Sequence, residues 1–309
     1  MRSVLIGTQK GGVGKTSLVA SLASLAARPQ DGRRVLVIDG DQQANLSRRN
    51  YGVDEDSGRG LYSTVVLGEP LRPVRDVRPG LDVVPGGPAL AMVAGASANA
   101  AAAGLDLGQN LARALRAAAD TSRYQLCLID LGPGDVALLD AVLAAVQFVV
   151  APHREDDADL DGVELLIRRV RRAQRDTNEE LRLLGTIHFA RDARATARNA
   201  ALRNSLDDML TGSPVTPFEA TIRHSPAVAR DARAANLTPV ELIEQAEAAS
   251  TDRIAMLRSR KQGRHAAPLP DRRLWGRPDA AELLARDYLA VLKELTARMD
   301  AAHNVEVHA

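Results

Sequence analysis

A glycine-rich segment near the start of the chain, Gly7 to Thr16, constrains the fold more than any other part of the sequence. It reads Gly-Thr-Gln-Lys-Gly-Gly-Val-Gly-Lys-Thr, and it lies between an apolar run at residues 3–7 and a helical pattern at residues 15–28. The leucines of that pattern, Leu18, Leu22 and Leu25, share one helical face. The spacing therefore predicts a buried strand, a loop and a helix in succession.

The loop has the residue types that phosphate binding requires. Gly11, Gly12 and Gly14 let backbone N–H groups curl around a phosphate, and the N-terminus of the following helix favours negative charge. Lys15 can reach the β- and γ-phosphates of a nucleotide, and Thr16 can offer its hydroxyl to Mg²⁺. The alternative is a glycine-rich turn without a ligand. The predicted phosphate contacts are Gly11, Gly12, Val13, Gly14, Lys15, Thr16 and Ser17.

Lysine is rare in this chain and is concentrated in the same loop. It occurs only at Lys10, Lys15, Lys261 and Lys293, and every other basic side chain apart from histidine is arginine. The lysines at 10 and 15 either reflect chance or mark two places that need a compact ammonium on a flexible stem. We favour the second interpretation.

Apolar runs alternate with helical patterns along the body of the chain. Short runs at residues 35–38, 81–84, 126–129, 148–151 and 183–188 predict buried strands, and residues 138–145 and 160–174 have helical length. Continuous apolar strands separated by helices indicate a parallel sheet with helices on both faces. We therefore expect a doubly wound α/β fold that binds its ligand at the carboxyl ends of the strands.

The composition suggests three regions. Residues 1–250 are expected to form the main domain, with residues 94–104 as a loop or weak helix, and residues 251–277 are arginine-rich and are expected to form a basic loop or linker. Residues 278–309 are expected to form a helix that docks on the main domain, followed by a short tail. The apolar stripe that supports this docking is Leu284, Tyr288, Leu292, Leu295 and Met299.

Carboxylates end two of the apolar runs. Asp39 and Asp41 follow the run at 35–38, and Asp130 follows the run at 126–129. Carboxylates at strand ends point toward the phosphate crevice, and two that are two residues apart share a side. Asp39 and Asp41 have the alternative interpretation of helix caps.

With Lys10 included, the loop reads Lys-Gly-Gly-x-Gly-Lys-Thr. This form resembles the deviant Walker A motif of the ParA/MinD family of dimeric ATPases, most closely the Soj-like ParA proteins. The resemblance extends over roughly residues 2–245 and includes residues 61–69, 81–85 and 218–223. It implies a P-loop NTPase fold, ATP and Mg²⁺ as cofactors, slow ATP hydrolysis and a sandwich homodimer in the ATP state.

The resemblance also implies roles for individual residues. Lys10 would reach across the dimer to the partner's nucleotide, and Lys10, Lys15 and Asp41 would form the catalytic set, with Asp41 positioning the attacking water. The implied metal-site residues are Thr16, Asp39 and Asp130, where Asp39 would support either Mg²⁺ or the loop. The adenine-pocket candidates are His188 and Asp192, although a packed core histidine is an equal alternative for His188.

The chain departs from the family pattern in three places. Gln42 and Ala44 stand where the family has proline and glycine, and Leu131-Gly132-Pro133 replaces Thr-Pro-Pro after Asp130. These changes affect the backbone after Asp41 and remove a threonine hydroxyl near the γ-phosphate. We therefore expect switch motion and the hydrolysis rate to be the properties that differ most from those of the family.

Composition narrows the choice of partners. The net charge is +1, aromatic residues are 3%, and Cys127 is the single cysteine, which excludes an intramolecular disulfide. No apolar run reaches the ~18 residues of a membrane span, and the last helical pattern is not basic-amphipathic. We expect a cytoplasmic protein without membrane attachment, and the scarcity of aromatic residues makes recognition by base stacking improbable.

Arginines in the second half of the chain are candidates for a DNA surface. Each alone could be a solvated helix face, but ParA-like dimers bind double-stranded DNA without sequence preference through basic residues of this half. The candidates are Arg203, Arg223, Arg230 and Arg233. The resemblance implies a nucleoid-associated partition ATPase stimulated by a ParB-like partner. The alternative is a ParA-like ATPase that positions a protein cargo.

Overall fold

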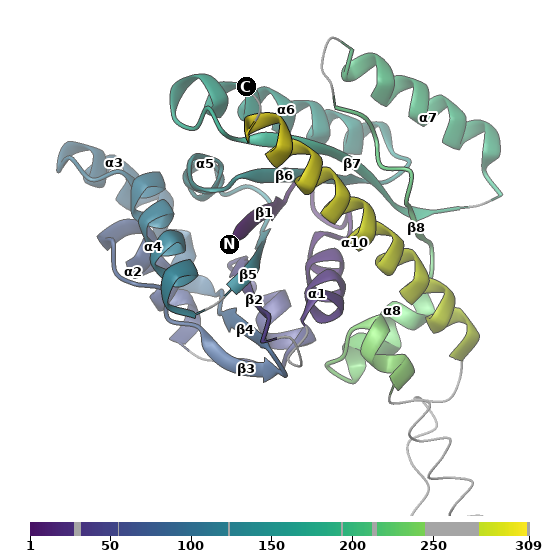
Figure 1. Ribbon diagram of the computed structural model, residues 1–309, viewed down its shortest axis with the longest axis horizontal. Coiled ribbons are helices and arrows are strands. Elements are labelled where there is room, and N and C mark those ends of the chain that lie inside the picture. The colour runs from purple at the N-terminus through teal and green to yellow at the C-terminus, as the bar shows by residue number, and fades with distance from the viewer. Residues whose placement is uncertain are drawn as a thin grey trace, which may run out of the picture.

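An eight-stranded sheet forms the centre of the computed structural model, which describes residues 1–27, 32–54, 56–122, 124–192, 194–211, 215–244 and 278–307. The strand order is β3-β4-β2-β5-β1-β6-β7-β8, and every strand pair is parallel except β3 with β4. The strands are β1 (Arg2–Ile6), β2 (Arg34–Gly40), β3 (Val74–Arg78), β4 (Leu81–Val84), β5 (Tyr124–Leu131), β6 (Phe148–His153), β7 (Arg182–Arg191) and β8 (Ile222–Arg223). The predicted doubly wound α/β fold is therefore confirmed (Figure 1).

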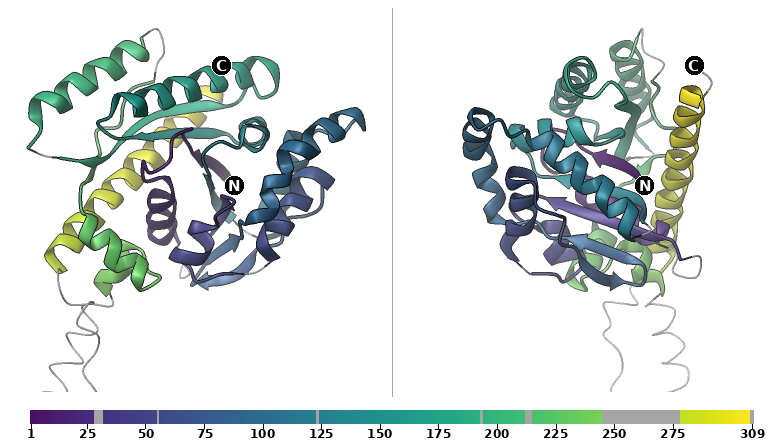
Figure 2. Two further views of the ribbon diagram at one scale, coloured as in Figure 1. Left: turned by 180° about the vertical axis from the view of Figure 1, so that it is seen from behind. Right: turned by 60° about the vertical axis from the view of Figure 1, so that its left-hand side comes forward.

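Helices cover both faces of this sheet (Figures 1 and 2). The helices are α1 (Lys15–Ala26), η2 (Asn45–Asn50), η3 (Asp56–Gly58), α2 (Arg59–Leu67), η4 (Pro88–Met92), α3 (Val93–Ala102), α4 (Leu107–Ser122), α5 (Val136–Ala145), α6 (Asp157–Asp176), α7 (Thr196–Met209), α8 (Pro226–Ala234) and α10 (Pro278–Val307). Side chains alternate between the two cores along a strand. Val4 and Ile6 of β1 pack with α1, α8 and α10, whereas Leu5 faces the core that contains α2 and α4 to α7.

The edge strands were not anticipated from the sequence. β3 reads Val-Arg-Asp-Val-Arg and is only partly buried, so it lacks the apolar run by which a central strand is recognised. β8 has two residues. Residues 94–104, expected as a loop or weak helix, contain most of α3, and the predicted linker at 251–277 lies outside the described residues.

The long C-terminal helix lies along α1 (Figures 1 and 2). Leu284, Tyr288, Leu295 and Met299 of the predicted stripe are buried in the core that α1 also enters. The helix extends to Val307, beyond the apolar stripe. Among the described residues, no helix combines the length and the apolar character needed to cross a membrane.

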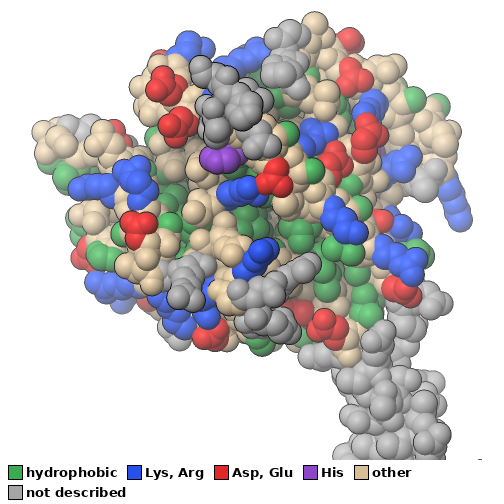
Figure 3. All heavy atoms as spheres, viewed as in Figure 1, with side chains coloured by type: hydrophobic (Ala, Val, Ile, Leu, Met, Phe, Trp, Pro, Cys, Tyr) green, Lys and Arg blue, Asp and Glu red, His purple; other side chains and the backbone are tan. Residues whose placement is uncertain are grey.

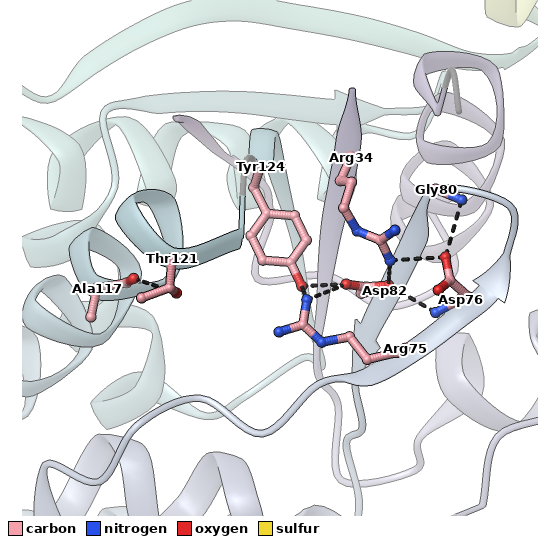
Figure 4. Close-up of polar contacts among 8 residues, drawn as sticks. All are labelled: Arg34, Arg75, Asp76, Gly80, Asp82, Ala117, Thr121 and Tyr124. Atoms are coloured by element: carbon pink, nitrogen blue, oxygen red, sulfur yellow. Dashed lines mark hydrogen bonds and ion pairs between the residues drawn. The ribbon is translucent and has the colours of Figure 1, made fainter. Parts of the chain in front are cut away.

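A buried carboxylate ties β3 and β4 to the sheet at the end opposite the phosphate loop (Figure 4). Asp82 of β4 is completely buried, and it accepts hydrogen bonds from Arg34, Tyr124 and the backbone N–H of Asp76. Arg75 also pairs with it at 2.8 Å. These hydrogen bonds outweigh burial, which favours the neutral acid, and so the pKa of Asp82 lies below its usual value.

Replacing Asp82 with alanine should destabilise the fold by about 3 kcal/mol, because the change removes a buried carboxylate that Arg34, Arg75 and Tyr124 share. Urea denaturation followed by circular dichroism measures the change. Asp54→Ala is a suitable control because Asp54 is exposed and pairs with Arg48 at the surface, where an ion pair contributes less than about 1 kcal/mol. Equal stability of the two variants would contradict the structural role of Asp82.

Candidate functional site

The glycine-rich loop joins β1 to α1 at the carboxyl end of the central strands. Gly12 and Gly14 have φ values of 82° and 87°, a region that side chains disfavour. A Cβ atom on Gly14 would also lie 2.4 Å from the ring of Phe189. Gly14 precedes the first residue of α1, so the loop presents a helix N-terminus to the cavity beside it.

Lys15 is buried beneath the loop, with its residue 5% exposed. Its Nζ donates a hydrogen bond of 2.6 Å to the carbonyl oxygen of Lys10, which bends the side chain back along the loop. Burial lowers the pKa of Lys15, although the carboxylates of Asp130 and Asp41 oppose this effect. A desolvated ammonium next to a glycine-rich turn is suited to bind phosphate oxygens.

Asp130 is the penultimate residue of β5 and contacts the loop through Thr16. The parallel register places Asp130 beside both Ile6 of β1 and Asp39 of β2. Thr16 Oγ1 donates a hydrogen bond of 2.6 Å to Asp130 Oδ2, while Oδ1 is buried without a hydrogen-bond partner among the described residues. Burial raises the pKa of Asp130 to about 8, and the neighbouring Asp39 adds to the shift.

This arrangement fits Mg²⁺. Asp130 has an unused buried oxygen, Thr16 has a hydroxyl beside it, and a cation would relieve the crowding of negative charge that raises the pKa of Asp130. The described residues include no cluster of three histidine, cysteine or acidic side chains able to hold a metal alone. Such a cluster is not required, because Mg²⁺ commonly binds through one or two protein oxygens together with water and substrate phosphates.

Asp39 is occupied within its own loop. Its Oδ2 accepts hydrogen bonds from both the N–H and the hydroxyl of Ser47, at 2.8 and 2.6 Å, and its Oδ1 accepts from the N–H of Asp41. The residue is completely buried, and burial raises its pKa to about 6. Of the two roles expected for Asp39, this geometry favours support of the loop over contact with the metal.

Asp41 lies at the cavity wall and is held from two sides. Oδ1 accepts from the N–H of Gln43 at 2.9 Å, and Oδ2 accepts from the side-chain amide of Asn45 at 3.1 Å. A Cβ atom on Gly132 would lie 2.7 Å from Asp41 Oδ1. The glycine that departs from the family pattern therefore makes room for the carboxylate.

Ala44 has a backbone conformation that favours glycine. Its φ and ψ are 50° and 39°, a left-handed conformation, and it directly precedes η2. An L-residue in this region costs roughly 1–2 kcal/mol. The segment after Asp41 therefore holds backbone strain next to the site.

Lys10, at the front of the loop, turns toward α6 of its own chain. Its Nζ lies 3.0 Å from Asp159 Oδ1 and 3.2 Å from Asp156 Oδ2. The Lys10 side chain is 34% exposed, whereas Asp159 is 3% exposed. Hydrogen bonding to Asp159, followed by that to Asp156, raises the pKa of Lys10. Lys10 is therefore partly exposed and is held by two carboxylates at the start of α6 or just before it.

A cavity of about 540 Å³ runs from the loop to α10. Its far wall is formed by residues that sequence reasoning did not assign to the site. They are Arg154, Phe189, the segment 222–226, Leu284 and Tyr288. Phe189 had one available signal, since it is one of only 3 phenylalanines and ends an apolar run. Leu284 and Tyr288 had no such signal, because docking of the helix on the main domain explains their apolar stripe equally well.

The two adenine-pocket candidates lie outside this cavity. His188 precedes Phe189 on β7 and faces the other side of the sheet, where its ring stacks on His153 at 5.3 Å. Burial, with the nearby His153, lowers the pKa of His188 to about 4. Asp192 is exposed and accepts a hydrogen bond from the N–H of Arg194. The structure therefore gives His188 the packed environment of the alternative interpretation.

Two of the four arginines that the sequence suggested for DNA are in ion pairs. Arg203 pairs with Glu219 at 2.5 Å, and Arg223 pairs with Asp287 at 2.6 Å. Arg230 and Arg233 lie exposed on α8, and Arg233 also lines the cavity beside the phosphate loop. Figure 3 shows basic side chains interspersed with acidic ones over the face it views, without a single continuous basic patch.

Several known proteins are similar in sequence to this chain. A family model described as an AAA domain matches residues 1–183. The chromosome-partitioning ATPase Soj of Thermus thermophilus is 34% identical over 194 residues, which cover 63% of this chain and 71% of that protein. The chromosome partitioning protein ParA of Caulobacter vibrioides is 31% identical over 205 residues, with the same two coverages.

Solved structures give the same fold. Cobyrinic acid a,c-diamide synthase of Mycobacterium smegmatis, solved with an ATP analogue and magnesium, has a TM-score of 0.59 at 29% identity and covers 73% of this chain and 88% of its own. A putative plasmid partition protein of Borrelia burgdorferi, bound to AMPPNP, has a TM-score of 0.62 at 17% identity, with coverages of 96% and 99%. At 17% identity, the similarity to the Borrelia burgdorferi protein supports only the fold. This chain therefore belongs to the AAA domain family of P-loop ATPases, within its ParA/MinD group.

Proposed function

We propose that this protein is a ParA-type partition ATPase, which binds Mg-ATP, closes into a homodimer and binds double-stranded DNA in that state. The observation that carries the proposal is the position of Lys10 and Lys15 at opposite ends of one phosphate loop. Lys15 is buried beneath the loop, and Lys10 is at the surface. In the proposal, Lys15 binds the chain's own nucleotide and Lys10 binds the nucleotide of a partner.

The hydrolytic step needs positioning and charge neutralisation more than covalent chemistry. In the proposal Lys15 and the loop N–H groups hold the phosphates, and Thr16 and Asp130 hold Mg²⁺, which neutralises charge on the phosphate oxygens when bound. Asp41 orients the attacking water. Asn45 and Gln43 fix the carboxylate of Asp41, so that its direction is set before the nucleotide arrives.

Dimerisation must change the partners of Lys10. In the described chain Lys10 pairs with Asp156 and Asp159, both contributed by the start of α6 or the turn before it. In the proposal, phosphate oxygens of a nucleotide across the interface replace these two carboxylates as the acceptors of Lys10. The intramolecular pair therefore holds Lys10 until a nucleotide-loaded partner is present.

The same proposal assigns DNA binding to the dimer and partner-stimulated hydrolysis to a ParB-like protein, with the nucleoid as the place of action. Arg230 and Arg233 are the better DNA candidates because they lie exposed on α8, whereas Arg203 and Arg223 are neutralised by acids. Binding through phosphate contacts alone is independent of sequence and weakens steeply with salt.

A DNA titration with ATP, ADP or no nucleotide, at two salt concentrations, tests the proposal. We expect binding with ATP only, and lower affinity at the higher salt. With Mg-ATP at saturation for each variant, Arg230→Glu with Arg233→Glu should reduce the affinity for DNA at least about tenfold, because two phosphate contacts become repulsive. The matched control is Arg171→Glu with Arg175→Glu on α6, which changes net charge equally at another exposed place. Binding that is indifferent to nucleotide would reject the proposed switch.

A further inference from the structure

The C-terminal helix forms part of the wall of the nucleotide cavity. Leu284 and Tyr288 of α10 line the same cavity as the phosphate loop, and both are almost completely buried. The family model ends at residue 183, so this wall lies outside the part of the chain that the model matches.

Between these two residues, Asp287 holds Arg223 at the cavity mouth. Its Oδ2 accepts from the backbone N–H of Arg223 at 3.0 Å and from Nε at 2.6 Å, and its Oδ1 accepts from the guanidinium Nη2 at 2.8 Å. Arg223 lines the cavity. Asp287 thus fixes both the main chain and the plane of the guanidinium, because the paired donors of arginine have a rigid geometry.

Two more charged residues of α10 hold the chain that leads to Arg223. Glu294 accepts hydrogen bonds from the N–H groups of Glu219 and Ala220, at 3.1 and 2.8 Å. Arg298 donates to the carbonyl oxygens of Thr216 and Pro217. Side chains of α10 therefore bind four backbone groups of the segment that leads to β8, which the N–H of Phe218 also joins to Thr186 of β7.

The position of this wall determines which end of a nucleotide it can contact. The phosphates belong at the loop, where Lys15, Thr16 and Asp130 converge. Phe189 covers Gly14 next to the loop, and residues 222–226 lie on the same far wall as Phe189. A nucleotide with its phosphates at the loop would direct its nucleoside end toward these groups.

We propose that Asp287 is a positioning residue for the nucleoside end of ATP, acting by holding Arg223 flat against the base or ribose. The proposal rests on the proposed nucleotide binding and adds a residue of the C-terminal helix to it. A flat guanidinium that is already neutralised can stack on a purine without a further charge to satisfy.

The test compares ATP with inorganic tripolyphosphate, which has the phosphates but no nucleoside. Asp287→Ala and the near-isosteric Asp287→Asn should each raise the Kd for Mg-ATP about tenfold, the loss expected for a charge-assisted pair. The Kd for tripolyphosphate should stay within about twofold. Glu282→Ala is the control, since Glu282 lies on the same helix and pairs with Arg286 at the surface. Isothermal titration calorimetry measures both ligands.

A double-mutant cycle with Arg223→Ala gives a second readout. Because Asp287 acts through Arg223, the double variant should bind ATP no more weakly than Arg223→Ala alone. Asp287→Glu should recover part of the lost affinity. Equal weakening of ATP and tripolyphosphate would mean that Asp287 serves general stability, and unchanged ATP affinity would remove its role; either result overturns the inference. A wild-type chain that binds neither ligand would instead overturn the proposed function, and this inference with it.

Discussion

Lys15→Ala should lose nucleotide binding, with the Kd for Mg-ATP raised at least about 100-fold. Lys15 is the buried cation beneath the loop, and the carboxylates of Asp41 and Asp130 lie close enough to affect its pKa. Without the Lys15 ammonium, the negative charges of Asp41 and Asp130 would repel the incoming phosphates. Truncating one partner of such a buried charge pair costs about 2–5 kcal/mol.

Calorimetry or displacement of a fluorescent ATP analogue measures the effect. Lys293→Ala is the matched control, since Lys293 is exposed on α10 and lies outside the cavity lining. The same loss of one lysine there should leave the Kd unchanged. Wild-type affinity in Lys15→Ala would show that the glycine-rich loop does not hold the phosphates.

Lys10→Ala should separate binding from dimerisation. The variant should bind ATP with an affinity close to that of the wild type, because the Lys10 ammonium points toward Asp156 and Asp159 rather than into the cavity of its own chain. It should remain a monomer with Mg-ATP, because the proposed contact across the interface is absent. The expected loss of dimer affinity is about 100-fold, the scale of a desolvated charge-assisted contact.

Size-exclusion chromatography with light scattering, with and without Mg-ATP, measures the dimer. Asp159→Asn provides the opposite test, because it weakens the intramolecular partner of Lys10 and should shift the ATP-dependent equilibrium toward the dimer. An ATP-dependent dimer formed by Lys10→Ala would contradict the proposed role across the interface.

The departures from the family pattern show where sequence reasoning stopped. From the residues, Ala44 and Gly132 could only be flagged as changes near Asp41 and Asp130. In the structure Ala44 keeps a left-handed backbone, and Gly132 leaves space that the Asp41 carboxylate fills. Both facts depend on φ angles and on contacts across strands, which a linear sequence does not contain.

The sequence by itself determined the sheet, the phosphate loop and the strand-end carboxylates. Each of these depends on local patterns: an apolar run, a set of glycines, or an acid directly after a strand. The parallel register then brings Asp39 and Asp130 side by side, because the carboxyl ends of parallel strands lie at the same edge of the sheet. The edge strand β3 could not be predicted in this way, because its charged residues interrupt the apolar run that identifies a strand.

Only the tertiary structure decided which long-range partners each charged group has. It placed Lys10 against Asp159, Arg223 against Asp287, and His188 on the face of β7 away from the cavity. These pairings join residues far apart in the chain, and their energies depend on burial and distance. One arginine looks like another in sequence, whereas in the folded chain an acid within hydrogen-bonding distance determines whether its charge is available to a partner.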